Sequence, residues 1–220
     1  MAYPTVDKPY GLKPINLIGG QVFAGSTRQR RIDSGASSIG FGDPVKFASD
    51  GTIVVCTETT TPPAAGFAGV FLGCTFVSSV TGQPTYSQQW TSGTSVKSGT
   101  YILAYVADDP DTLFKAVGVD SGTVVSTTSG FVYADIGTNV ALVANTLNTT
   151  TGDSQQGLKF STVATTRSLP IRIVDVVEDT AFVSSGTTYY PEVIVKFNAP
   201  YITGESLIVG GHAYNNPLGI

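Results

Sequence analysis

The stretch that most constrains the fold runs from Phe67 to Val77 and reads FAGVFLGCTFV. Side chains alternate between the two faces of an extended strand, so every second residue shares a face. One face would then be wholly apolar and would hold Val70, Leu72, Cys74 and Phe76. The opposite face carries Gly69 and Gly73, which predicts close approach by another backbone or ring. A long, two-faced strand of this kind indicates a β protein.

The same period of two recurs along the chain, whereas helical periodicity is almost absent. Further strands are predicted at residues 45–48, 52–57, 100–106, 130–134, 169–177 and 192–198. Asp50-Gly51 predicts a two-residue hairpin turn, and Asp175 breaks the alternation of its strand and predicts a bulge near Val174. Residues 139–147 are the one candidate helix, weakened by β-branched residues and Asn. The predicted fold class is all-β, a β-barrel or β-sandwich, with a jelly roll among the options.

The two ends of the chain differ in pattern from the middle. Residues 1–25 contain three prolines and no alternation, which predicts an extended N-terminal arm. Residues 26–200 form the predicted β core, as one body or as two lobes with a break within residues 81–99. Residues 201–220 form a C-terminal tail. Each end is either frayed or an arm that orders against a neighbour, and the candidate anchors are Tyr3, Tyr10, Leu12, Tyr214 and Leu218.

Charge and hydropathy restrict the kinds of partner. A net charge of −4 and a pI near 4.8 argue against nucleic-acid binding. Charged residues make up only 13% of the chain, against about 25% in typical soluble domains. An uncharged polar surface of this kind suits a β protein with large protein contacts. No apolar run reaches the ~20 residues of a membrane span, and residues 1–8 do not resemble a signal peptide, so we expect assembly in the cytoplasm and no membrane partner.

Residues that could carry chemistry are few. His212 is the only histidine, and no Gly-x-Ser-x-Gly motif is present, so we expect this histidine to be exposed or interfacial and not catalytic. The acidic cluster at residues 108–111 is expected to form a proline-containing turn with Asp side chains capping its amides. Cys56 and Cys74 are expected to be buried free thiols, with a bridge between them as the other option. The sequence therefore predicts no enzyme, no catalytic residue, no cofactor and no metal site.

Two features point instead to protein contacts. Arg28-Gln29-Arg30-Arg31 is the only basic concentration, and in a strand Arg28 and Arg30 share one face while Arg31 lies on the other. Such residues would either bind carboxylates on a partner or protect a sheet edge from aggregation. Trp90 lies in a polar loop, where it would either fold back onto the core or anchor an interface.

Several short motifs, in this order and spacing, resemble a family of tailed-phage virion proteins, especially of marine and cyanobacterial phages. They are PYGLKP at residues 9–14, SIGFGDPVK at 38–46, GVFLGC at 69–74, GQPTYSQ at 82–88 with Trp90, AYV at 104–106, DDP at 108–110, IGTN at 136–139 and LPIRI at 169–173. The resemblance implies a cement or head decoration protein on the outer capsid surface.

In that role the chain would associate as a homodimer or homotrimer and bridge neighbouring major capsid protein subunits. The resemblance carries over no active-site residue. Two other functions stay open. One is another virion component, such as a tail or fibre-base part. The other is a carbohydrate-binding module for host attachment, in which Trp90 or Tyr86 would contact the glycan.

Overall fold

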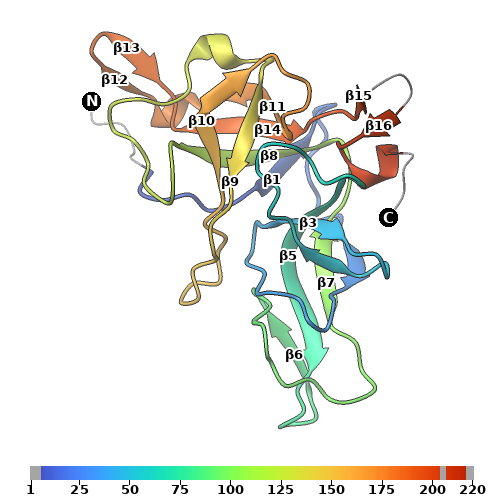
Figure 1. Ribbon diagram of the computed structural model, residues 1–220. Coiled ribbons are helices and arrows are strands. Elements are labelled where there is room, and N and C mark those ends of the chain that lie inside the picture. Colours follow the sequence, from blue (N-terminus) through green and yellow to red (C-terminus); the bar gives the residue numbers. More distant parts are fainter. Residues whose placement is uncertain (1–5, 204–206, 217–220) are drawn as a thin grey trace.

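The structure, a computed structural model, describes residues 6–203 and 207–216. One half of the molecule is a closed five-stranded β-barrel, in which β8 pairs with both β10 and β14 (Figure 1). Its strands, in sheet order, are β8 (Thr112–Val119), β10 (Gly157–Ala164), β9 (Asn139–Val143), β11 (Ile171–Val176) and β14 (Glu192–Phe197). A further strand, β1 (Lys13–Leu17), pairs antiparallel with β8.

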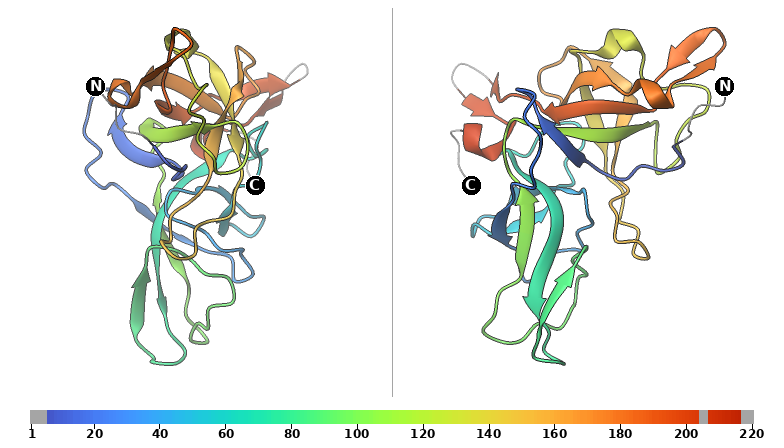
Figure 2. Two further views of the ribbon diagram at one scale, coloured as in Figure 1. Left: turned by 90° about the vertical axis from the view of Figure 1, so that its left-hand side faces the viewer. Right: turned by 180° about the vertical axis from the view of Figure 1, so that it is seen from behind.

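The other half is a second sheet, here called the distal sheet, which extends away from the barrel (Figure 2). Its strands, in sheet order, are β2 (Arg28–Arg31), β7 (Leu103–Ala107), β5 (Phe67–Val77), β3 (Pro44–Phe47) and β4 (Ile53–Val55), with β6 (Pro84–Ser87) paired to β5. A bridge between Ile32 and Ile53 joins the two ends of this sheet. The all-β prediction is confirmed.

Short elements complete the described chain. Two hairpins are formed by β12 (Phe182–Ser184) with β13 (Thr187–Tyr189) and by β15 (Tyr201–Thr203) with β16 (Leu207–Val209). Single 3-10 turns are η1 (Tyr133–Asp135), η2 (Glu178–Thr180) and η3 (Ala213–Asn215). The β12–β13 hairpin and the tip of the β5–β6 hairpin lie at opposite ends of the molecule (Figure 1).

Strand β5 joins the two halves because it contributes to both hydrophobic cores. Phe67 and Val70 belong to the core of the barrel, whereas Phe71 and Cys74 belong to the core of the distal sheet. Residues three apart share a face here because the pairing of β5 shifts by one residue against both β3 and β7. Each bulge inserts an extra residue and reverses the faces. The prediction of one continuous apolar face on this strand is therefore wrong.

The predicted close approach at the glycines of β5 is confirmed. A Cβ atom on Gly69 would lie 2.3 Å from the carbonyl oxygen of Ala107, and the residue has a φ of 136°. Only glycine adopts this conformation without strain, and only glycine allows β7 to come so near. This contact holds β5 and β7 together at the point where the chain passes from one core to the other.

Other local predictions had mixed outcomes. The bulge near Val174 is confirmed, since Ile173 pairs with Val195 but Asp175 pairs with the adjacent Ile194. The predicted helix at residues 139–147 is wrong, because residues 139–143 form β9 in the barrel wall. The hairpin around Asp50-Gly51 is confirmed, but its loop is longer than two residues: the N–H of Ala48 donates to the carbonyl of Thr52 at 2.8 Å.

The prediction of an extended N-terminal arm over residues 1–25 is wrong for residues 9–17. Within residues 1–25, β1 is part of the barrel sheet, and Leu12 is buried with its N–H donating to the carbonyl of Gly42 at 2.8 Å. Residues 9–17 therefore pack on their own chain, because β1 pairs with β8 and Leu12 is part of the barrel core.

The C-terminal tail packs back in the same way. The N–H of Phe67 donates to the carbonyl of Gly211 at 2.8 Å, and the amide of Asn216 donates to the carbonyl of Ala64 at 2.6 Å. The change from distal sheet to barrel falls at the turn 108–111 between β7 and β8. Residues 81–99, the place considered for a break between two lobes, contain β6 of the distal sheet and Trp90 of its core.

Candidate protein-interface site

The pairing of β2 with β7 gathers the basic residues of β2 around one carboxylate. Arg28 pairs with Val106 and Arg30 with Ala104, so both side chains stand on the face that Asp108 continues just beyond β7. The Nε atom of Arg28 lies 3.2 Å from Oδ2 of Asp108, and Nη2 of Arg30 lies 3.3 Å from the same oxygen. The predicted pairing of Arg28 and Arg30 on one face is confirmed, but their carboxylate belongs to this chain.

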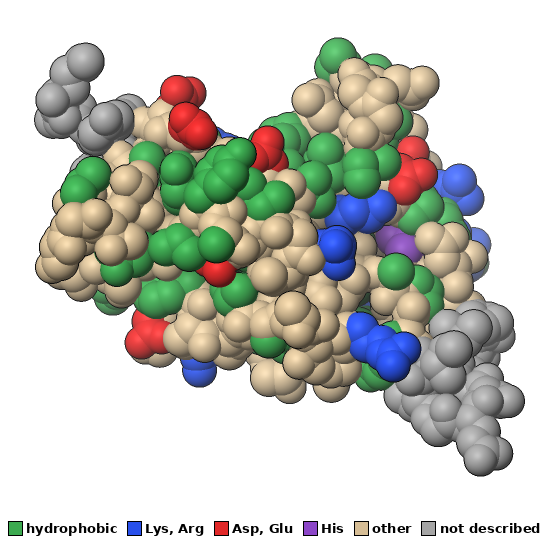
Figure 3. All heavy atoms as spheres, turned by 90° about the horizontal axis from the view of Figure 1, so that it is seen from above, with side chains coloured by type: hydrophobic (Ala, Val, Ile, Leu, Met, Phe, Trp, Pro, Cys, Tyr) green, Lys and Arg blue, Asp and Glu red, His purple; other side chains and the backbone are tan. Residues whose placement is uncertain are grey.

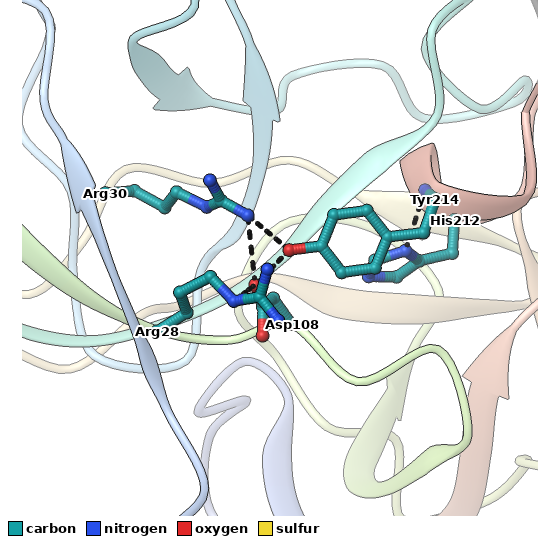
Figure 4. A network of polar contacts seen from close by, with 5 residues as sticks. All are labelled: Arg28, Arg30, Asp108, His212 and Tyr214. Atoms are coloured by element: carbon teal, nitrogen blue, oxygen red, sulfur yellow. Dashed lines mark hydrogen bonds and ion pairs between the residues drawn. The ribbon is translucent and has the colours of Figure 1, made fainter.

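The C-terminal segment brings an aromatic residue to the same point (Figure 4). The hydroxyl of Tyr214, on η3, donates to Oδ2 of Asp108 and accepts a hydrogen bond from Nη2 of Arg30. The guanidinium groups of Arg28 and Arg30 lie 5.3 Å and 5.8 Å from the centre of the Tyr214 ring. Asp108 thus binds three donors from two distant segments of the chain, β2 and η3.

His212 packs against Tyr214, with the ring centres 4.9 Å apart, and is buried, with 2% of its surface exposed. Its Nδ1 accepts the N–H of Tyr214 at 3.3 Å, which caps η3, and its ring packs 6.1 Å from that of Phe197. Burial lowers the pKa of His212 to about 4, against the raising effect of Asp108 and Asp109. The expectation of an exposed or interfacial histidine is wrong, because the C-terminal segment folds over the barrel and covers it.

Part of the cluster remains open to solvent. The side chain of Arg28 is 59% exposed, and Tyr214 is 43% exposed. Two guanidinium groups face one carboxylate, so the cluster carries a net positive charge. Burial, followed by the hydrogen bond to Asp108, raises the pKa of Tyr214 above its ordinary value. The arrangement presents a fixed tyrosine and an exposed arginine, which are the residue types favoured at protein interfaces.

The other predicted interface residues lie elsewhere. Arg31 points to the opposite face of β2 and stacks 3.6 Å from the centre of the exposed Tyr101 ring. Tyr10 is half-buried and donates its hydroxyl to Glu192, and burial followed by this carboxylate raises its pKa. The structure therefore brings together Arg28, Arg30 and Tyr214, and it separates Arg31 and Tyr10 from them.

Two candidates are core residues, and two lie outside the described residues. Trp90 is 2% exposed and packs edge-on against Phe76, so it folds back onto the distal core and does not anchor an interface. Leu12, also 2% exposed, is covered by its own chain. Tyr3 and Leu218 fall in the parts of the chain that the structure does not describe.

Sequence reasoning missed Asp108 and His212 as members of this cluster. The turn at 108–111 was predicted correctly, and Oδ1 of Asp109 does accept the N–H of Asp111 at 2.8 Å. Asp108 has another role, for which a signal was present: the densest acidic cluster and the only basic cluster are natural partners. No signal in the sequence indicated that His212 would be covered.

The two cysteines lie apart from this cluster. Cys56 and Cys74 are buried free thiols in different cores, as expected, and burial raises the pKa of Cys74 to about 11. Within residues 6–203 and 207–216, no group of three or more His, Cys, Asp and Glu side chains is placed to hold a metal ion. The same residues contain no helix with the length and apolar character that a bilayer crossing requires.

Comparison with family models, with curated proteins and with solved structures gave no significant match for this chain.

Proposed function

We propose that this protein is a virion structural protein that decorates the outer capsid surface and cements it by bridging neighbouring major capsid protein subunits. The proposal rests first on the sequence resemblance to tailed-phage decoration proteins. The observation that supports it in the structure is a body with exposed apolar residues on hairpins at opposite ends. A bridging protein needs such a spacer with a contact at each end.

The two ends are defined by exposed side chains on hairpins. Val183, on the β12–β13 hairpin, is 65% exposed, and Val80, at the tip of the β5–β6 hairpin, is 87% exposed. These hairpins lie at opposite ends of the molecule (Figure 1), and β5 links the barrel core to the distal core between them. Each contact needs to contribute little free energy, because many copies act together on one shell.

The composition of the surface supports the same function. Seen from above, the face in Figure 3 is mostly uncharged polar and apolar, with only scattered Lys, Arg, Asp and Glu side chains. Interface cores are depleted in charge in the same way. The cluster of Arg28, Arg30 and Tyr214 would add a basic contact for acidic capsid surface, and self-association as a homodimer or homotrimer would multiply these contacts.

The deciding experiment measures the number of copies of the chain relative to the major capsid protein in purified virions, by quantitative mass spectrometry. A ratio near one, or another simple fraction set by shell symmetry, is expected. A ratio of a few per cent would overturn the capsid proposal and favour a tail or fibre-base component.

A second experiment tests the bridging itself. The Val183→Asp and Val80→Asp variants should each be lost from capsids in a co-sedimentation assay while keeping the wild-type thermal unfolding curve. Val124→Asp is the matched control, since Val124 is 74% exposed but lies on neither hairpin. Retention of both end variants at wild-type occupancy would remove these ends from the mechanism.

One observation supports the alternative function, carbohydrate binding. Tyr86 is 74% exposed, and with Tyr105 and Phe41 it lines a shallow cavity of about 340 Å³ beside β6. Aromatic rings in an open groove can stack on sugar rings. Binding to a glycan array that is lost in Tyr86→Ala would favour this function, whereas Trp90 is buried and cannot take part.

A further inference from the structure

A cavity of about 710 Å³ lies where the loops of the two halves meet. Ser37 and Ser38, ahead of β3, line it from the side of the distal sheet, and residues 144–147, after β9, line it from the side of the barrel. The side chains around its opening are exposed and polar, among them Thr57 and Thr146. A cavity of this size corresponds to a small-molecule or side-chain site.

Two buried residues in its wall each keep an oxygen without a hydrogen-bond partner. Asp43 is 2% exposed, and its Oδ2 accepts the N–H of Gly40 at 2.7 Å, but its Oδ1 has no partner. Gln156 is 3% exposed, and its Oε1 likewise has no partner. Among the described residues, no Lys, Arg or His forms an ion pair with Asp43.

A buried carboxylate without a compensating cation destabilises the fold. Removing such a group from water costs several kcal/mol unless an opposite charge offsets it. Burial raises the pKa of Asp43 to about 6, although the neighbouring polar groups of Ser154, Gly40 and Gln156 act to lower it. A cation in the cavity would lower this cost through Coulomb attraction even without direct contact, because the protein interior screens charge weakly.

The lining residues favour an organic cation over a metal ion. Calcium takes six to eight oxygen ligands, usually including several carboxylates. Among the described residues that line this cavity, Asp43 is the only carboxylate. The volume is also large for a single ion. The many hydroxyl and amide oxygens of the lining are hydrogen-bond acceptors for N–H groups, and a guanidinium presents five donors in one plane.

We propose that this cavity binds an organic cation with several N–H donors, namely the guanidinium or ammonium group of an arginine or lysine side chain. Asp43 supplies the opposite charge, and Gln156 and the hydroxyl groups of the opening accept the donated hydrogen bonds. The basic side chain belongs to a protein partner or to a free amino-acid derivative, which present the same group. The inference does not depend on the capsid proposal.

The test uses the purified full chain and a pair of probes that differ in charge. Nα-acetyl-arginine amide and its neutral isostere Nα-acetyl-citrulline amide are titrated while the backbone amide signals of Ser38 and Ala144 are followed by NMR. The arginine probe should bind at least tenfold more tightly than the citrulline probe. Equal binding of the two probes, or no binding of the arginine probe, would overturn the proposal.

Variants locate the site and keep the test decisive. Asp43→Asn should remove the tenfold preference for arginine over citrulline. If that variant does not fold, Thr146→Trp fills the cavity from an exposed loop position, and Thr150→Trp, exposed on the same loop but outside the lining, is its control. Thr146→Trp should abolish binding and Thr150→Trp should not. Unchanged binding in Thr146→Trp, or displacement of the arginine probe by millimolar calcium alone, would overturn the proposal.

A last comparison distinguishes a protein partner from a free amino-acid derivative as the source of the cation. An arginine-containing peptide that binds at least tenfold more tightly than the capped amino acid indicates a protein partner. Equal affinities indicate that the side-chain group alone is recognised. Both results support the site, and they differ only in what occupies it.

Discussion

The barrel and the distal sheet meet at two seams that are built in different ways. The backbone seam, made by residues 10–12, 40–43 and 152–156, is a set of main-chain hydrogen bonds between buried loops. The N–H of Phe41 donates to the carbonyl of Gly152, and the N–H of Ser154 donates to the carbonyl of Phe41, both at 2.9 Å. The side-chain seam is the cluster of Arg28, Arg30, Asp108 and Tyr214.

Because the seams are built differently, we expect the backbone seam to contribute mainly to folding stability and the side-chain seam mainly to partner binding. Main-chain bonds in the backbone seam require close approach of the loops, so a larger side chain there disturbs the packing directly. The side-chain seam joins β2 to the C-terminal segment through groups that remain partly exposed, such as Arg28. Changes in the backbone seam should therefore unfold the protein, whereas changes in the side-chain seam should alter binding more than folding.

The largest expected effect is in the backbone seam. Gly11 and Gly25 both have a φ of 75°, but a Cβ on Gly11 would lie 2.4 Å from the carbonyl oxygen of Gly42, whereas one on Gly25 meets nothing within 4 Å. Gly11→Ala should lower the free energy of unfolding by more than about 3 kcal/mol, because strain and overlap add. Gly25→Ala should cost only about 1–2 kcal/mol, from strain alone. Equal losses in urea denaturation would show that the seam is not tightly packed.

The next effect concerns His212 beside the side-chain seam. Its pKa is lowered from 6.5 to about 4, mainly by burial, so between these values the unfolded chain binds a proton that the folded chain does not. The resulting contribution of His212 to the free energy of unfolding is fully present above pH 6.5 and decreases by about 3 kcal/mol as the pH falls towards 4. The difference in unfolding free energy between wild type and His212→Gln should change by that amount between pH 7 and pH 4. A constant difference would contradict the burial of a neutral histidine.

Asp43 in the backbone seam should show the opposite slope. Its pKa is raised from 3.8 to about 6 by burial, so the folded chain binds a proton that the unfolded chain does not. The resulting stabilisation is fully present below pH 3.8 and is lost as the pH rises through 6, by about 3 kcal/mol. Asp43→Asn should remove this slope, as measured by chemical denaturation from pH 4 to pH 7. The same slope in both proteins would assign it to another group.

A smaller effect is expected when the carboxylate of the side-chain seam is neutralised. Asp108→Asn leaves two guanidinium groups without their counter-ion and should cost about 1–3 kcal/mol. Asp109→Asn is the matched control, because an asparagine oxygen can still accept the N–H of Asp111. Thermal unfolding of the two variants gives the comparison, and a control that loses as much stability as Asp108→Asn would point to the turn instead of the cluster.

The smallest effect on folding should come from Arg28. Its side chain is 59% exposed, and exposed ion pairs contribute about 0–1 kcal/mol. Arg28→Ala should leave the unfolding free energy within 1 kcal/mol of wild type, and under the proposed capsid function it should weaken co-sedimentation with capsids. The conservative Arg28→Lys keeps the charge and should restore part of the binding. A large loss of stability in Arg28→Ala would remove the distinction between the two seams.

Local patterns in the sequence determined a large part of this structure. The period of two identified β3, β4, β5, β7, β11 and β14, the phase break at Asp175 located a bulge, and Gly69 indicated a close backbone approach. It gave no signal for β8 and β10, and the strand predicted at residues 130–134 is wrong, because only Phe131 forms a bridge there and η1 follows. These features depend on residues near one another in the chain, where side-chain alternation and backbone strain act directly. The buried thiols and the turn at 108–111 were predictable for the same reason.

Tertiary structure alone decided the rest. The two bulges in β5 assign Phe67 to one core and Phe71 to the other, because pairing with β3 and β7 sets the register. Burial of Leu12, Trp90 and His212 likewise depends on segments distant in sequence that cover them. The composition of the two ends was compatible with free arms. Residues 9–17 and 210–216 are part of the folded body because their packing on the barrel edge and the barrel core lowers the free energy of the folded chain.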